Sequence, residues 1–282
     1  DTDSTGSPII WSWYLKEKKG LSAAPKLLGE PNTEALFVLD HWGFEKPEII
    51  NSINKGDSVI IVDTNNPAEL PEGINDADIQ GIIDHHKLVG GLETSGPIDI
   101  TIRPVACTAT IMFDLMGDDV SDMPDPIKGL ALSCIISDTL EFRSPTTTRR
   151  DREVAESLAK DLKIDVSDYA SKLFRAKSDV SDFSDAQLLR MDSKKYPIAD
   201  LMFRISVLET TEPDMIFRRK SSLIEAMETV CTEDSVDHVL FFVVDILREE
   251  STLFVPNKSV KKVAEKSFGV SVSDDSVLLP GV

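Results

Sequence analysis

Short apolar runs that end on polar residues recur along this chain and constrain its fold more than any other feature. Three runs predict strands: ALFVLD, which ends at Asp40, SVIIVDTNN, where Asp63 follows the aliphatics, and IQGIIDHH, which ends on Asp84, His85 and His86. Patterns typical of helices, such as CTATIMFDLM and PDPIKGLALSCIISD, lie after them. Strands that alternate with helices predict an α/β fold with a parallel sheet and helices on both faces.

Two helix-start signals support the helical half of this pattern. Asp125 followed by Pro126 is typical of a cap and first-turn pair. In SPTTTRRDREVAESLAKDL, Thr148 and Asp151 have the spacing of a capping box, which predicts that another helix begins there.

The polar residues that follow the predicted strands are expected to meet at one edge of the sheet. In open α/β sheets, ligands bind beyond the carboxyl ends of the strands. Asp63, Asp84, His85 and His86 all fall at such ends. Two adjacent imidazoles after a carboxylate pack poorly but serve well as metal ligands and proton donors.

A change in composition near residue 178 predicts a second domain. SDVSDFSD is short, polar and acidic, and it predicts a linker over 178–185 between domains at 1–177 and 186–282. The second domain is predicted to be smaller and mixed α/β. Its expected strands are ADLMFRISVLET, DHVLFFVVDIL and STLFVP, and its expected helices are KSVKKVAEKSF and TTEPDMIFRRKSSLIEAMETV, capped by Thr211.

The composition of the 282 residues limits the partners of this chain. A net charge of −19 argues against a nucleic acid partner, because binding to phosphate backbones needs basic patches. The acidity does not exclude a small anionic ligand that is held by metal ions and a few local cations. No apolar run is long enough to cross a membrane. Three scattered cysteines in apolar contexts predict reduced thiols and a cytoplasmic protein.

Four clusters contain candidate metal ligands, each with an ordinary structural alternative. Asp1 and Asp3 in DTDST could equally form a helix cap, Asp63 could be a turn residue, and Asp138 could simply end a helix. The histidines of DHH could be polar strand-end residues. Taken together, Asp1, Asp3, Asp63, His85 and Asp138 suit Mn²⁺, Fe²⁺, Co²⁺ or Zn²⁺ and not Ca²⁺, which prefers oxygen alone.

The order and spacing of these motifs resemble a known family. DTDS, VDTNN, DHH, CTAT and SDTLEFRSPTTTRRD are similar to the successive motifs of the DHH phosphoesterase superfamily. The nearest resemblance is to the family II, manganese-dependent inorganic pyrophosphatases. It covers essentially the whole chain, including TTEPDMIFRRK and GVSVSDDSVLLPGV.

The resemblance implies roles for particular residues. Two Mn²⁺ ions would share Asp63, with Co²⁺ as an alternative metal and Mg²⁺ accompanying the substrate. Asp1 would bind one ion, whereas Asp3, His85 and Asp138 would bind the other. His86 would contact the substrate phosphate and donate a proton, with Asp84 orienting the histidine pair. Lys194 of MDSKKYP would bind phosphate in the second domain.

The resemblance also implies an activity and a setting. Pyrophosphate would be hydrolysed to two phosphates by a metal-bridging hydroxide, at a site between the two domains of a cytoplasmic homodimer. Two alternatives stay open: an exopolyphosphatase of the same superfamily, and a metal-binding protein that keeps the fold without catalysis. The family pattern includes a His-x-x-Pro before Asp1 and a Ser-Arg-Lys-Lys after Val282, so we expect the working protein to extend beyond both ends.

Overall fold

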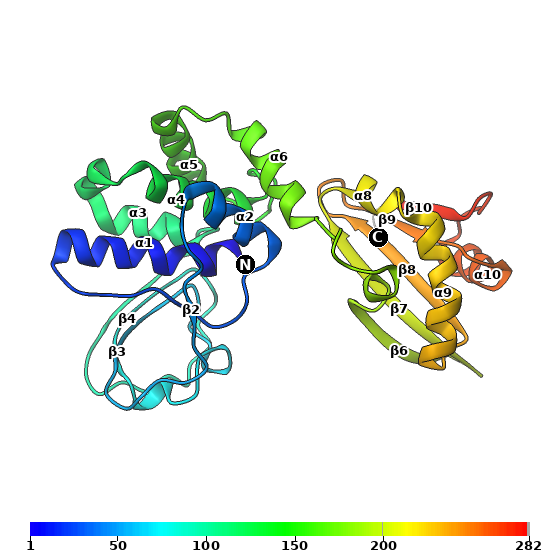
Figure 1. Cartoon of the computed structure of the whole chain (residues 1–282), viewed down its shortest axis with the longest axis horizontal. Helices are drawn as coiled ribbons and strands as arrows, with labels where there is room; N and C mark the ends of the chain where they lie inside the picture. Colours follow the sequence, from blue (N-terminus) through cyan, green and yellow to red (C-terminus); the bar gives the residue numbers. More distant parts are fainter. Residues whose placement is uncertain (199, 281–282) are drawn as a thin grey trace. The chain divides into compact units, whose positions relative to one another are not determined.

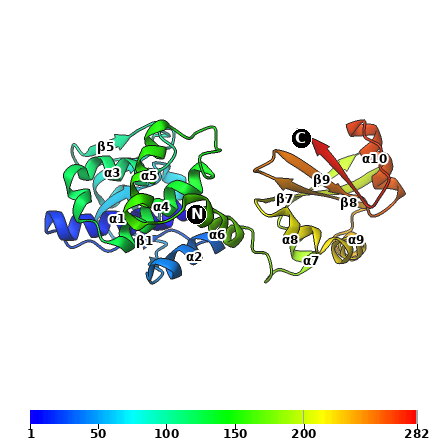
Figure 2. The same cartoon turned by 90° about the horizontal axis from the view of Figure 1, so that it is seen from above.

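The structure is a computed structural model that describes residues 1–198 and 200–280. The chain divides into two compact units, Asp1–Ala176 and Lys177–Val282, and each unit has its own sheet and hydrophobic core (Figures 1 and 2). Within the described residues, no helix combines the length and apolar character needed to cross a bilayer.

The first unit has an α/β fold that is built from short strands and longer helices. Its strands are β1 Lys26–Leu27, β2 Glu48–Ile49, β3 Ser58–Val62, β4 Asp78–Asp84 and β5 Asp99–Ile102. Its α-helices are α1 Thr2–Lys19, α2 Thr33–Trp42, α3 Thr108–Met116, α4 Asp125–Thr139, α5 Arg149–Leu162 and α6 Val166–Lys177, which reaches the unit boundary. The 3₁₀ helices are η1 Pro67–Glu69, η2 Ile74–Asp76 and η3 Gly117–Asp122.

The central sheet of this unit is parallel, as predicted, with the strand order β3-β4-β5. Helices α1 and α3 pack against β3 and β4, and α4 packs against α1 (Figure 1). Ile61, Ile79 and Ile82 of the sheet pack with Ile74 of η2 in a separate apolar cluster. Packing against these helices and this apolar cluster therefore holds the strands in place and limits the movement of the side chains that follow them.

The run ALFVLD does not form the expected strand and lies in α2 instead. Asn32 caps this helix by accepting a 2.8 Å hydrogen bond from the Ala35 amide, and Gly43 ends it with φ 76°. The buried residues Ala35, Val38 and Leu39 follow the helical spacing of three and four. The strand prediction was wrong because a short apolar run fits a strand and a helix equally well, and only the spacing of its buried residues distinguishes them.

The two helix-start predictions have different outcomes. The capping box of Thr148 and Asp151 is confirmed at the start of α5. Asp125, in contrast, is the first residue of α4 and not its cap. Pro124 occupies the cap position, and the helix start has no side-chain cap hydrogen bond. Pro126, the second residue of α4, has its φ fixed near the helical value, which favours a helix start at this point.

The second unit contains a five-stranded mixed sheet of order β10-β9-β8-β7-β6, in which only β7 and β8 pair in parallel. Its strands are β6 Asp192–Ile198, β7 Leu201–Thr210, β8 His238–Asp245, β9 Glu250–Phe254 and β10 Ser276–Pro280. Its helices are α7 Asp185–Leu188, α8 Pro213–Phe217, α9 Lys220–Asp234 and α10 Lys258–Phe268. The predicted strands β7, β8 and β9 and the predicted helix α10 are confirmed.

Alternate residues of β8 supply the two cores of this unit. Phe241 packs with Leu223 and Met227 of α9, whereas Leu240 packs with Val260 of α10, so helices cover both faces of the sheet.

The helix expected to run from a Thr211 cap is interrupted, and that cap prediction was wrong. Glu212 precedes α8, and a break at 218–219 separates α8 from α9. The Thr211 hydroxyl lies 2.8 Å from the Ser178 hydroxyl, and its amide donates to the same oxygen. Its hydrogen bonds therefore join the end of β7 to the segment after α6 and do not cap a helix.

Candidate metal centre

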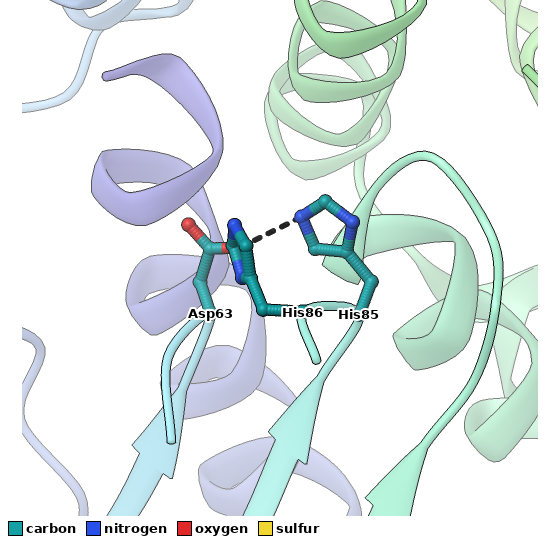
Figure 3. Close-up of side chains that lie close together, drawn as sticks. All are labelled: Asp63, His85 and His86. Carbon is teal, nitrogen blue, oxygen red and sulfur yellow. Dashed lines mark ion pairs between the residues drawn. The ribbon is translucent and has the colours of Figure 1, made fainter. Parts of the chain in front are cut away.

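The ends of β3 and β4 bring Asp63 and the histidine pair together. The Asp63 amide extends the ladder by donating to the Ile83 carbonyl at 2.9 Å. The backbone of Asp63 then turns into the left-handed region, with φ 63°. Figure 3 shows the side chains of Asp63, His85 and His86 grouped above these neighbouring strand ends. His85 Nε2 lies 3.4 Å from Asp63 Oδ1.

Two helices deliver the other acidic residues to this place. Asp3 lies in the first turn of α1 and is 1% exposed. Asp138 lies in the last turn of α4. Asp1 caps α1 through a capping box with Ser4, which is the helix-cap alternative considered for this segment. The DTDST segment is thus both a helix cap, through Asp1, and a source of a buried carboxylate, through Asp3.

The side chains form two overlapping groups with metal-ligand spacing. One contains Asp3, His85 and Asp138, and the other contains Asp63, His85 and His86; within each group one ligand atom from every residue lies within 4.8 Å of the others. His85 belongs to both. Side chains from two strand ends and two helices therefore converge on His85, as the positions of the strand ends led us to expect for the DHH segment.

Thr108 at the start of α3 holds two of the carboxylates, and the sequence interpretation missed it. Its amide donates to Asp3 Oδ2 at 2.6 Å, and its hydroxyl donates to Asp63 Oδ1 at 2.9 Å. The Val105 carbonyl accepts a 3.2 Å hydrogen bond from His85 Nδ1, which leaves Nε2 facing the carboxylates. The CTAT motif contains Thr108, but a backbone carbonyl such as that of Val105 has no signal in a sequence.

Burial and the repulsion of neighbouring carboxylates raise the pKa values of Asp63 and Asp138. Burial and the neighbouring Asp3 charge raise the pKa of Asp63 to about 7, although His85 and Thr108 donate to it. Burial, together with the charges of Asp3 and Asp63, raises the pKa of Asp138 well above its usual range. Burial lowers the pKa of His85, but the hydrogen bond to Asp63 and the charges of Asp3 and Asp63 outweigh it and raise this pKa.

These residues fit a divalent metal. The buried Asp138 Oδ2 has no hydrogen-bond partner, which is costly for a carboxylate unless a cation binds there. Three carboxylates around an imidazole nitrogen form the mixed oxygen and nitrogen donor set that suits Mn²⁺ and similar metals. A bound cation would also favour the ionised forms of Asp63 and Asp138, against the repulsion that raises their pKa values.

Asp84 orients the histidine pair from beneath. It is fully buried, and its Oδ1 accepts from the amides of His85 and His86 and lies 2.8 Å from His86 Nδ1. Asn65 Nδ2 donates to its Oδ2 at 2.5 Å. Burial raises the pKa of Asp84, but the hydrogen bonds from Asn65 and His86 outweigh it and lower this pKa.

Two predicted site residues lie apart from these groups. The Asp1 carboxylate is exposed and accepts from the Ser4 amide and hydroxyl, and Asp1 belongs to neither group. Lys194 lies on β6 of the second unit with an exposed side chain. Among the described residues the Lys194 side chain has no hydrogen bond or ion pair, whereas Lys195 Nζ donates to the Asp234 carbonyl at 2.5 Å.

Comparison with known proteins places both units in one family. The model of the DHH family N-terminal domain matches residues 1–137, and the DHHA2 domain model matches residues 171–282. A probable manganese-dependent inorganic pyrophosphatase of Deinococcus radiodurans is 38% identical over 95% of this chain and 87% of its own length. A protein of the same name from Lactobacillus acidophilus is 33% identical over 100% of this chain and 91% of its own length.

The chain belongs to the family II inorganic pyrophosphatases. A solved structure from Methanococcus jannaschii, described as a candidate family II inorganic pyrophosphatase, has a TM-score of 0.65 and 32% identity over 100% of this chain and 91% of that one. An exopolyphosphatase-related protein from Bacteroides fragilis has a TM-score of 0.51 at 15% identity, with 99% of this chain and 83% of that one covered. That second likeness shows only that the two proteins share a fold.

Proposed function

We propose that this protein hydrolyses inorganic pyrophosphate to two phosphates in a manganese-dependent reaction. The observation that carries the proposal is the convergence of Asp3, Asp63 and Asp138 on His85 in a member of this family. Pyrophosphate is a strongly charged anion that repels a nucleophile. Cations bound by the clustered carboxylates would supply the positive charge that such a substrate needs.

The proposed centre holds two Mn²⁺ ions, with Asp63 shared between them and Mg²⁺ accompanying the substrate. Co²⁺ is the alternative metal. Bound ions would neutralise phosphate oxygens and acidify the attacking water. Asp3, His85 and Asp138 are the proposed ligands of one ion. Asp1 is proposed for the other, and its carboxylate would have to exchange its contacts with Ser4 for the metal.

His86 is the proposed proton donor to the leaving phosphate. Asp84 lies 2.8 Å from its Nδ1, so Nε2 is the nitrogen that can face a substrate, and the side chain is 54% exposed. A half-exposed imidazole whose orientation is fixed by a carboxylate suits general acid catalysis. Lys194 is the proposed phosphate-binding residue of the second unit, and the engagement of Lys195 with Asp234 favours Lys194 for that role.

We also propose that the protein acts in the cytoplasm as a homodimer. Free Cys107, Cys134 and Cys231 support a reducing compartment. Strand β5 lies at an edge of the parallel sheet, and its Ile100 is 55% exposed, which supports pairing with another chain. Light scattering of the full-length protein tests the dimer, and a monomer at micromolar concentration contradicts it.

A phosphate-release assay tests the proposed reaction. The full-length protein with Mn²⁺ and Mg²⁺ is given pyrophosphate or tripolyphosphate at equal concentrations, and released phosphate is measured. We expect pyrophosphate to be cleaved with the larger kcat/KM. Faster release from tripolyphosphate would favour the exopolyphosphatase alternative. Mn²⁺ binding without phosphate release from either substrate would favour a non-catalytic protein.

A further inference from the structure

The carboxylate of Asp151 makes more hydrogen bonds than a helix cap requires. Asp151 lies in the first turn of α5 and is fully buried. Its Oδ2 accepts from the Thr148 amide at 2.8 Å and the Thr148 hydroxyl at 2.6 Å, which completes the capping box. The same Oδ2 also accepts from the Ala106 amide at 3.0 Å, and Oδ1 accepts from the Thr110 hydroxyl at 2.7 Å.

These two additional bonds fix the segment that orients the metal centre. Ala106 lies directly after Val105, whose carbonyl accepts from His85 Nδ1. Two residues further on, Thr108 donates to both Asp3 and Asp63. The segment 105–108 leads into α3, whose first residue is Thr108, and belongs to none of the described strands, so no strand pairing holds it in place. Asp151 holds this segment at Ala106 and, through Thr110, within the first turn of α3.

We infer that Asp151 is a positioning residue of the metal centre, acting through the 105–108 segment on His85, Asp3 and Asp63. The inference rests on the proposed function because it takes this centre to bind Mn²⁺. Asp151 touches none of the proposed ligands, and its contacts set where the Val105 carbonyl and the Thr108 donors lie. Groups that orient metal ligands in this way commonly change metal affinity by about 10- to 100-fold when they are removed.

The substitution Asp151→Asn separates this role from a simple cap. Asparagine has nearly the same shape but only one acceptor oxygen, so it cannot accept from the Ala106 amide and the Thr110 hydroxyl at once, and the hold on the segment weakens. Binding is measured from the electron paramagnetic resonance signal of free Mn²⁺, at a temperature well below unfolding. We expect the Mn²⁺ dissociation constant of the full-length variant to rise by about 10- to 100-fold.

Thr148→Ala is the matched control. It removes the cap hydroxyl of the same helix and keeps the bonds from Asp151 to Ala106 and Thr110. We expect it to lower the melting temperature while leaving Mn²⁺ affinity within about twofold of wild type. Thr110→Val is a second test that removes only the Thr110 donor, and it serves also if Asp151→Asn does not fold. We expect it to weaken Mn²⁺ binding.

Three outcomes decide the inference. Wild-type Mn²⁺ affinity in both Asp151→Asn and Thr110→Val would overturn it. Equal loss of affinity in Thr148→Ala would overturn it too, because general loosening of α5 would then explain the effect. Wild-type protein that binds Mn²⁺ but releases no phosphate would overturn the proposed function alone, and the affinities of the variants would still decide the role of Asp151.

Discussion

At the scale of single residues, Asp63 carries two costs in the metal-free protein. Its backbone has φ 63°, a conformation that non-glycine residues adopt rarely, although aspartate tolerates it better than most. Its carboxyl is buried beside Asp3, which raises its pKa to about 7. Strain and burial of charge are typical of functional sites, and a bound cation would offset the second cost.

The raised pKa values predict how Asp138→Asn changes stability. A native pKa above the unfolded value means that the native state binds more protons, so stability is lost as pH rises from about 4 to 7. The Asp63 shift from 3.8 to about 7 corresponds to roughly 4 kcal/mol. We expect metal-free Asp138→Asn to be more stable than wild type at pH 8 by about 1–2 kcal/mol, with little difference at pH 5.

Denaturant unfolding of the metal-free proteins at the two pH values measures this difference. With saturating Mn²⁺ the order is expected to reverse, because wild type gains binding energy that the variant has lost. A metal-free Asp138→Asn protein that is less stable than wild type at pH 8 would mean that the carboxylates do not repel one another as their burial implies.

Substitutions of the two neighbouring histidines are predicted to have different effects. His85→Gln should weaken Mn²⁺ binding, since His85 Nε2 belongs to both groups of ligands. His86→Gln should lower kcat by about 10²- to 10⁴-fold, the usual range for a general acid, with little change in Mn²⁺ affinity. Metal binding and steady-state hydrolysis of pyrophosphate check both variants. If His86→Gln loses Mn²⁺, His86 is a metal ligand. Its ring lies close enough to Asp63 and His85 for that role.

Much of the proposed site could be predicted from the sequence, but its supporting contacts could not. Asp3, His85 and Asp138 meet as expected because strand ends and helix ends of an α/β unit converge on one edge. The contributions of Thr108 and Asp151 escaped prediction. Thr108 acts partly through its backbone amide, and the capping box at α5 gives no hint that Asp151 also reaches Ala106, 45 residues earlier.

At the scale of elements, strands with strongly apolar sequences could be predicted, whereas elements that depend on pairing or packing with other parts of the chain could not. Strands β3, β4 and β8 each contain a run of at least two buried or half-buried apolar residues and were predicted. Helix α2 was assigned as a strand, because short apolar runs fit both periods. Strand β6 was not predicted, since its sequence DSKKYPI is mostly exposed and is held by pairing with β7. The break between α8 and α9 has no proline or glycine to signal it.

The segment 178–185, predicted as a linker, has many contacts with the second unit. Arg219, at the start of α9, donates to the carbonyls of Val180 and Phe183 and to the carboxylate of Asp185. Ser178 binds Thr211 at the end of β7. Hydrogen bonds that involve a charged group contribute about 1.5–3 kcal/mol each, so Arg219 contributes substantially to holding this segment in place.

Arg219→Met is therefore predicted to expose this segment to proteolysis. Methionine keeps most of the side-chain volume but removes every donor. We expect chymotrypsin to cut after Phe183 at least about tenfold faster, because losing 1.4 kcal/mol of local stability raises the open population tenfold. Arg218→Met is the control, since the exposed side chain of Arg218 makes no hydrogen bond or ion pair within the described part of the chain. Mass spectrometry identifies the cut, and equal rates for both variants would contradict the prediction.

At the scale of the whole molecule, strong acidity and a cation-dependent site belong together. A net charge of −19 repels an anionic substrate, so the protein needs a local positive charge to bind one. Asp3, Asp63, His85 and Asp138 can concentrate divalent cations at one place in the first unit. Every proposed role depends on that single centre, with Asp63 as its shared ligand.

Mn²⁺ binding to Asp63→Asn tests this centre most directly. Equilibrium dialysis of the full-length wild-type protein is expected to give two Mn²⁺ ions per chain, with phosphate release from pyrophosphate rising as the sites fill. Asp63→Asn is expected to lose tight binding of both ions and nearly all turnover, because one carboxylate serves both. An Asp63→Asn protein that binds two Mn²⁺ ions with wild-type affinity and still releases phosphate would contradict the proposed centre.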